Sequence, residues 1–251
     1  MQQRIAKADT VVVVGGGAAG VEVATDAKSF YPDKHIILVH SRAAVMHRFG
    51  KDLQTAALEG LKRLDVEVIL EDRVIEEDDA NGTVTLKSGR KIECNFFINC
   101  TGQKPNSSIL STLSPNSISS SGYIKVKPTL QLVDEKYQNI YSCGDVTDMD
   151  VPTPNARSAM QQSVVAAENI LLAIDGKVPK HEYQHTWPES LIKLTLGLDR
   201  SVTHLSDGKS DILWRSKEKD DALMAAQCWK SLGQVPFEDD YMQNQKEEGQ
   251  V

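Results

Sequence analysis

The sequence predicts an α/β protein with a parallel β-sheet at its centre, and the order of its apolar runs carries this prediction. The run "TVVVVG" at residues 10–15 is continuous, apolar and β-branched, as expected for a strand that is buried on both faces. A helical pattern extends from Ala18 to about Phe30 and ends before Pro32. "KHIILVH" and "VEVIL" predict two further strands, with a helical face over residues 51–64 between them. This strand–helix–strand–helix–strand order predicts parallel pairing with right-handed crossovers.

The pattern changes near residue 72. "DRVIEED" and "TVTLKSGRKIEC" alternate apolar and polar residues and carry turn signals at Asn81-Gly82 and Ser88-Gly89. We therefore expect a small antiparallel β-meander inserted into the α/β unit. "NFFINCTG" then predicts a last buried strand of the parallel sheet, ending in a glycine turn.

The second half of the chain has weaker signals. Residues 104–134 are rich in Ser, Pro and Asn and predict loops with short strands, "NIYSCGD" predicts a short strand, and residues 156–173 predict a long helix. Beyond Gly176, "SLIKLTLGLDRSVTHLSDG" predicts two strands around a Leu-Asp-Arg turn, and residues 220–231 predict a short helix. The acidic, polar tail from Pro236 is expected to be disordered.

Composition limits the class of protein. The net charge of -7 argues against non-specific nucleic-acid binding, which needs a basic face. No apolar run reaches the roughly 18 residues of a transmembrane helix, and "MQQRIAKADT" lacks the apolar core of a signal peptide. The four cysteines form no C-x-x-C pair, so we expect reduced thiols in a cytoplasmic protein and no disulfide-reductase centre.

The strongest functional signal is the glycine turn after the first strand. Gly15, Gly17 and Gly20 stand in the spacing G-x-G-x-x-G. The first glycine permits a tight turn, the second lets the backbone approach a pyrophosphate, and the third lets the helix pack closely on the strand. Free N–H groups and the helix dipole then favour the anion. The flanking strand and helix are the context that this motif requires, so a Rossmann-type nucleotide site is predicted.

The end of the second strand indicates which nucleotide is bound. An acidic residue here would bind the ribose 2′-OH of NAD, but this chain has His40, Ser41 and Arg42, with His47 and Arg48 close behind. A hydroxyl and guanidinium groups suit a 2′-phosphate, so NADPH is favoured, or the use of both NADPH and NADH. The alternative is that the two arginines are ordinary solvated charges.

Three motifs in this order, "VVVVGGGAAGVEVA", "INCTGQKPN" and "IYSCGDV", resemble the pyridine-nucleotide–disulfide oxidoreductase superfamily. Within it the chain is most similar to apoptosis-inducing-factor-like oxidoreductases of the ferroptosis-suppressor type. These flavoproteins are FAD-dependent NAD(P)H:quinone reductases without a redox disulfide. "WKSLGQ" near Trp229 resembles the C-terminal end of that group, so the resemblance extends to about Gln234.

The resemblance implies roles for individual residues. Glu22, in the family's G-V-E, would lie near the nicotinamide, and Thr101 and Gly102 would lie where two nucleotide-binding domains meet. Gly144 and Asp145 match the family's second FAD motif, in which the aspartate accepts hydrogen bonds from the ribityl chain. The helix that begins near residue 155 would point its N-terminus at the flavin, where its dipole stabilises charge on the reduced ring.

The resemblance also organises the chain into four parts. We expect an NAD(P)-binding Rossmann domain with the inserted meander at 8–104 and a partial FAD-domain segment at 105–178, followed by a small α+β region at 179–235 and the tail at 236–251. The chain departs from the family at Thr25-Asp26, where Gly-Glu is common. Only ten residues precede the strand at Val11, whereas in the family a complete FAD-binding half, about a whole domain, stands there.

Two functions of different class follow. The first is an FAD-dependent NAD(P)H:acceptor oxidoreductase with a quinone-type acceptor, truncated or split, in which the cofactors carry the chemistry and no side chain is required as a nucleophile. The second is a flavin-free nucleotide-binding or small-molecule-binding protein derived from that family. Without the FAD-binding half, an apolar face over residues 144–173 should be exposed, which predicts self-association or docking on a separate FAD-binding chain.

Overall fold

The computed structural model describes residues 1–78, 80–206, 210–218, 228–230 and 232–234. Its helices are α1 (Gln2–Lys7), α2 (Ala18–Phe30), α3 (Lys51–Arg63) and α4 (Ala156–Ile174). Its strands are β1 (Thr10–Val14), β2 (His35–Val39), β3 (Glu67–Ile69), β4 (Val74–Asp78), β5 (Thr83–Leu86), β6 (Lys91–Glu93), β7 (Phe96–Asn99), β8 (Ile192–Thr195), β9 (Arg200–Ser206) and β10 (Asp211–Lys217). Short 3-10 turns lie at Ser108–Leu110, Pro115–Ser117, Glu135–Tyr137 and Trp187–Ser190.

The centre of the fold is a parallel sheet with the strand order β3-β2-β1-β7. All four strands match runs that the sequence predicts, and α2 and α3 form the expected crossovers. The four valines of β1 are buried because the sheet is covered on both faces. The predicted Rossmann-type α/β fold is therefore confirmed.

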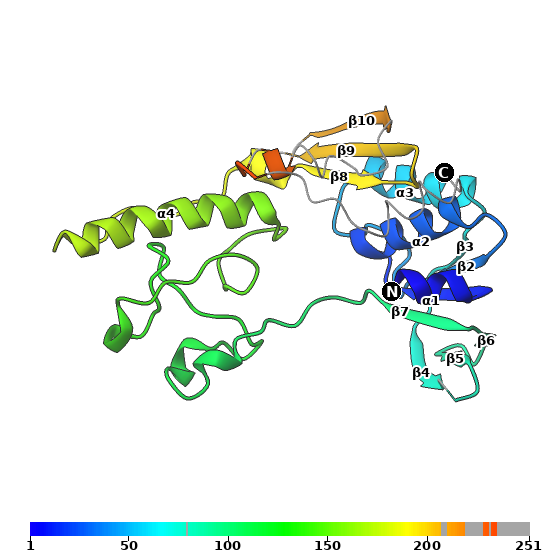
Figure 1. Ribbon diagram of the computed structural model, residues 1–251, viewed down its shortest axis with the longest axis horizontal. Coiled ribbons are helices and arrows are strands. Elements are labelled where there is room, and N and C mark those ends of the chain that lie inside the picture. Colours follow the sequence, from blue (N-terminus) through cyan, green and yellow to red (C-terminus); the bar gives the residue numbers. More distant parts are fainter. Residues whose placement is uncertain (79, 207–209, 219–227, 231, 235–251) are drawn as a thin grey trace.

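The two faces of this sheet have different covers (Figure 1). Helices α2 and α3 pack on one face and form the largest core with Val11, Val13 and Ile36. The meander β4-β5-β6 is antiparallel, as predicted, and it buries Val84 and Leu86 against the opposite face.

A third sheet, β10-β9-β8, covers the outer side of α2 and α3 (Figure 1). Leu194, Leu196 and Val202 of this C-terminal sheet belong to the same core as the two helices. The two strands predicted around the Leu-Asp-Arg turn are β8 and β9, whereas β10 and the short helix α1 were not predicted. The predicted helix at 220–231 lies largely, and the tail entirely, outside the described residues.

The segment from 105 to 178 lies to one side of the Rossmann domain and holds little regular structure before α4 (Figure 1). The strand predicted at "NIYSCGD" is wrong, because Tyr141 makes only one isolated bridge, to Gln131. A strand needs a continuous ladder, but the pairing with residues 130–132 stops after this single bridge.

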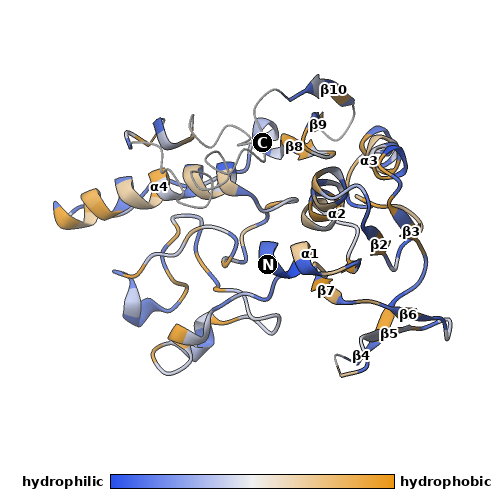
Figure 2. Cartoon of the chain, turned by 45° about the vertical axis from the view of Figure 1, so that its right-hand side comes forward, coloured by the Kyte–Doolittle hydropathy of each residue, from blue (hydrophilic) through white to orange (hydrophobic). Residues whose placement is uncertain are grey.

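Helix α4 has its polar and apolar faces reversed relative to an ordinary surface helix. Ser158, Gln162 and Asn169 are buried against the chain beneath it. Its large apolar side chains are exposed, as predicted for this segment. They are Met160, Val164, Ile170, Leu171 and Ile174. Figure 2 shows that the ribbon of α4 is mostly orange toward its far end. Among the described residues, no helix is both long and apolar enough to cross a membrane.

Candidate functional site

The glycine turn between β1 and α2 has the geometry that close approach to a ligand requires. Gly15 has φ +114°, and a Cβ there would lie 2.5 Å from the Cys100 carbonyl oxygen. At Gly20 an added Cβ would collide with the Gly15 carbonyl, so this glycine sets the close packing of helix on strand. Gly17 begins α2 without a capping side chain, and a Cβ there would meet nothing. The start of α2 therefore lies open at the cleft, where the unpaired N–H groups of a first helical turn favour an anion.

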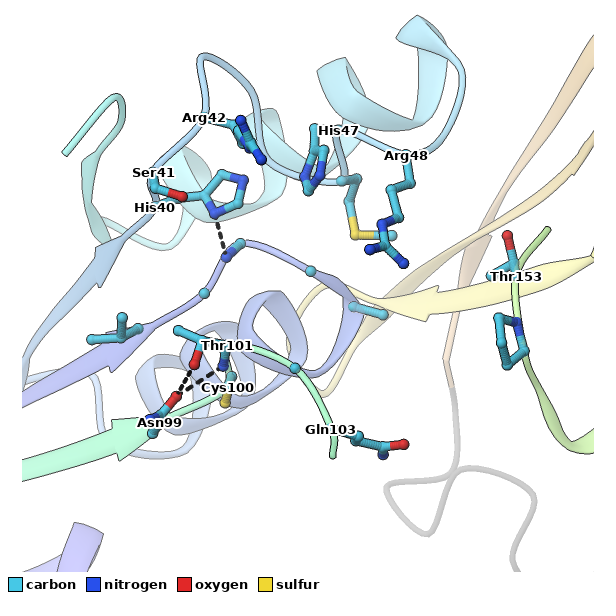
Figure 3. Close-up of a pocket in the computed structure, with 18 of the residues that line it drawn as sticks. His40, Ser41, Arg42, His47, Arg48, Asn99, Cys100, Thr101, Gln103 and Thr153 are labelled. Atoms are coloured by element: carbon cyan, nitrogen blue, oxygen red, sulfur yellow. Dashed lines mark hydrogen bonds between the residues drawn. The ribbon is translucent and has the colours of Figure 1, made fainter. Parts of the chain in front are cut away.

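His40 supports this turn from the end of β2. Its Nδ1 accepts the Gly16 N–H at 3.0 Å, and the side chain is buried (Figure 3). Burial lowers the pKa of His40, and the nearby His47 and Arg42 lower it further. The ring therefore acts as a neutral acceptor that fixes the glycine turn, at the position where an NAD-binding domain usually carries an acid.

A loop at residues 41–49, the basic loop, carries the cations of the site. Arg42, His47 and Arg48 are exposed on the same side of the glycine turn (Figure 3). The His40 and His47 ring centroids are 5.3 Å apart. Burial, followed by Arg42 and Arg48, lowers the pKa of His47, so the arginines supply most of the positive charge near neutral pH.

The opposite wall comes from the end of β7. Asn99 Oδ1 accepts both the N–H of Thr101, at 2.9 Å, and its hydroxyl, at 2.5 Å, which fixes this turn. Gly102 has φ +114°, so the chain leaves the strand sharply. Burial raises the pKa of Cys100, which keeps it a thiol rather than a reactive thiolate.

An open cleft of about 1570 Å³ joins these walls to the segment that follows. Gly15, Gly17, His40, Ser41, Arg42, Thr101, Gly102 and Asp145 all line it. Asp145 belongs to the 105–178 segment and is exposed, and its carboxylate makes no hydrogen bond within the described part of the chain. The cleft thus brings together the predicted nucleotide turn and the predicted flavin contact.

Three of the predicted site residues do not line the cleft. Gly20 packs against the Gly15 carbonyl, and the Gly144 N–H donates to Gln162 Oε1 at 2.6 Å. Glu22 faces the C-terminal sheet, where its Oε1 accepts the Thr195 N–H at 3.2 Å. Burial raises the pKa of Glu22 despite this hydrogen bond. The predicted nicotinamide contact of Glu22 stays a prediction.

Sequence reasoning missed several residues of the cleft. Asn99 could have been identified from the rule that ligands bind at the carboxyl ends of parallel strands, because β1, β2 and β7 all end at this edge of the sheet. Arg157 and Lys193 also line the cleft, but no local pattern marks them because their place depends on the path of the later chain. Among the described residues, no group of three His, Cys, Asp or Glu side chains could hold a metal ion.

The parallel sheet, the glycine turn and the cleft at the carboxyl ends of the strands define the class of dinucleotide-binding α/β proteins. A family model described as pyridine nucleotide-disulphide oxidoreductase matches residues 2–169. The chain belongs to this family, and its relatives include proteins of the ferroptosis-suppressor and apoptosis-inducing-factor type.

Two curated relatives illustrate the relationship. Fe-regulated protein 8 of Mycosarcoma maydis is 37% identical over 216 residues, which cover 83% of this chain and 52% of the relative. Ferroptosis suppressor protein 1 of Taeniopygia guttata is 30% identical over 244 residues, covering 94% of this chain and 64% of the relative. The chain thus spans between half and two thirds of the length of these relatives.

Solved structures with the same fold include a NAD-dependent persulfide reductase from A. fulgidus, with a TM-score of 0.66 and 19% identity over 83% of this chain and 38% of that one. A water-forming NADH oxidase from Lactobacillus brevis, bound to NADH, has a TM-score of 0.65 and 20% identity over 81% of this chain and 44% of that one. These structures support the fold assignment.

Proposed function

We propose that this chain supplies the NAD(P)H site and part of the flavin site of an FAD-dependent NAD(P)H:acceptor oxidoreductase with a quinone-type acceptor. The observation that carries the proposal is the common cleft, since the glycine turn at Gly15–Gly17 and the exposed carboxylate of Asp145 open onto the same space. The family match and the name of one relative, an FAD-dependent oxidoreductase from Flammulina velutipes, support it.

In this proposal a flavin held beside the nucleotide would supply the redox chemistry between NAD(P)H and the acceptor. The residues of this chain bind and orient the two cofactors. The N–H groups at the start of α2 hold the pyrophosphate, and Thr101 and Gly102 form the turn where the two cofactors approach. Asp145 would accept hydrogen bonds from the flavin's sugar-alcohol chain, a role that its exposed carboxylate fits.

We further propose that NADPH is the preferred nucleotide. Arg42 and Arg48 lie on the same side of the glycine turn, and the three residues that follow β2, His40, Ser41 and Arg42, include no acid of the kind that binds a bare ribose. Asp72 also lines the cleft, and its N–H donates to the His40 carbonyl. An engineered water-forming NADPH oxidase, bound to NADPH, differs from its NADH-oxidase parent by substitutions that remove an aspartate and add two arginines and a serine. The basic loop of this chain has the same chemical character.

The first experiment measures cofactor binding by the purified chain. We expect NADPH to bind more tightly than NADH in titration calorimetry. A yellow protein that bleaches on addition of NADPH would support the flavoenzyme proposal for this chain. A colourless chain that takes up no added FAD but binds NADPH would favour the second candidate, a flavin-free nucleotide-binding protein.

We propose a domain organisation of four parts, at 8–104, 105–178, 179–235 and 236–251, and the cytoplasm as the location of the protein.

The exposed apolar face of α4 supports a covering partner, for which we propose a second copy of the chain or a separate FAD-binding chain. Light scattering tests the homo-oligomer. If the wild-type chain self-associates and Leu171→Glu makes it monomeric, the apolar face of α4 is the interface between copies. If the wild-type chain is already monomeric, the partner proposed for this face is the separate FAD-binding chain.

A further inference from the structure

We propose that the C-terminal sheet sets the position of the basic loop and thereby the preference for NADPH over NADH. The contact consists of His204 and Asp211, from β9 and β10, against Phe49 and Gly50 at the end of the loop. These positioning residues lie more than 150 positions from the loop in sequence. The inference rests on the proposed function, because it concerns the nucleotide that the cleft binds.

One end of the basic loop is anchored by the glycine turn and the core. Val45 and Met46 are buried, and the Met46 N–H donates to the Gly16 carbonyl at 2.7 Å. Met46 has φ +52°, so the chain turns sharply at this anchor. This anchor ties the first half of the loop to the same turn that holds the pyrophosphate.

The other end of the loop is anchored by the C-terminal sheet. The Phe49 ring lines the cleft and meets the His204 ring edge to face, with centroids 6.0 Å apart and planes at 88°. His204 is only 2% exposed, and neither of its ring nitrogens has a hydrogen bond within the described residues. Its Nε2 lies 3.4 Å from Asp211 Oδ1, which gives this buried ring one polar neighbour.

The Asp211 carboxylate packs directly against the backbone of Gly50, and a Cβ at Gly50 would collide with it. Gly50 is the N-cap of α3 and carries no capping side chain. Because a helix N-terminus favours negative charge, the carboxylate of β10 adds to the favourable charge of Asp52 in the first turn of α3. An alanine at position 50 would therefore force the Asp211 carboxylate to move away from the start of α3.

His47 and Arg48 stand between these two anchors and face the cleft. A charge-assisted hydrogen bond to a phosphate weakens steeply when its length or angle changes, so a shift of the second anchor would affect the 2′-phosphate first. NADH lacks this phosphate and should be less sensitive. The ratio of the two dissociation constants therefore reports the position of the loop, whereas general destabilisation would change both constants together.

The test is a double-mutant cycle with Gly50→Ala and Asp211→Ala, measured by titration with NADPH and with NADH. We expect Gly50→Ala to weaken NADPH binding about tenfold and NADH binding less than about threefold, as for the loss of one charge-assisted contact. In the Asp211→Ala background the added methyl group has room, so Gly50→Ala should cost less than about threefold for NADPH. Asp211→Asn keeps the shape of the side chain but removes its charge, and it tests the same contact if Gly50→Ala does not fold. We expect Asp211→Asn to lower the ratio of NADPH affinity to NADH affinity.

Asp199→Ala is the matched control. Asp199 lies in the turn between β8 and β9 of the same sheet and pairs with Arg63 at the opposite end of α3, so its loss should leave the preference unchanged. The inference is overturned if Gly50→Ala weakens both nucleotides equally, or costs the same in both backgrounds. A wild-type chain that binds neither nucleotide would instead overturn the proposed function, so the two failures are distinguishable.

Discussion

Asp26 offers the sharpest test of the electrostatics of this fold. It lies on α2, one turn after Glu22, with a buried Oδ1 that has no hydrogen bond within the described residues. Burial, followed by the charge of Glu22, raises the pKa of Asp26 from 3.8 to about 6. Between these values the folded state binds more protons than the unfolded state, so stability should fall as pH rises from about 4 to 6 and then level off.

The shift corresponds to at most about 3 kcal/mol, since one pKa unit is about 1.4 kcal/mol. Asp26 keeps some contact with water, and screening reduces the figure to about 1 kcal/mol. We therefore predict that Asp26→Asn is more stable than the wild type at pH 7.5, with a melting temperature roughly 2–4 °C higher.

The assay is thermal and urea unfolding, followed by circular dichroism at several values of pH. The advantage of Asp26→Asn should shrink as pH approaches 4, where the wild-type carboxyl is protonated in the folded state. Asp175→Asn, at an exposed ion pair with Lys177, serves as the matched control. An Asn variant that is less stable at pH 7.5, or an advantage that does not depend on pH, would refute the reasoning.

Three further predictions concern the cleft and the segment beneath α4. Arg42→Ala and Arg48→Ala should each weaken NADPH binding about tenfold and NADH binding little, because each removes one charge-assisted contact; equal losses for both nucleotides would count against a 2′-phosphate site. Gly15→Ala should abolish binding of both nucleotides in the same titration, since its Cβ would displace the chain at Cys100; retained affinity would contradict the proposed turn. Glu189 accepts hydrogen bonds from Tyr183 and Thr186, and although burial opposes them, these bonds lower its pKa to about 2. Its contribution to stability should therefore be present above about pH 4.5 and be lost as pH falls toward 2, and Glu189→Gln should cost about 2 kcal/mol at pH 7 in urea unfolding.

Local pattern was enough to predict the parallel sheet, both crossover helices, the meander and the glycine turn. These elements follow from residues adjacent in sequence, such as the valine run of β1 and the alternation in β5. The false strand at "NIYSCGD" has the right composition, but its neighbour pairs with it over one bridge only. Composition alone does not show how far such pairing extends.

The candidate site likewise has a part that the local sequence predicts and a part that depends on distant contacts. The spacing of Gly15 and Gly17 and the basic character of the loop could be read from the sequence. The orientation of Glu22 could not, because its partner Thr195 lies 173 residues further along the chain. The contact of Asp211 with Gly50 was hidden for the same reason, since neither residue carries a local signal for it.

The C-terminal sheet over α2 and α3 has a consequence for how the chain folds during synthesis. The outer surface of these helices belongs to a core that also needs Leu194, Leu196 and Val202. About 130 residues separate the end of α3 from β8, so a ribosome working at about 5–20 residues per second would leave that surface bare for roughly 6–26 s. A chaperone that binds apolar helix surfaces therefore has its longest opportunity after α3 emerges and before β8 does.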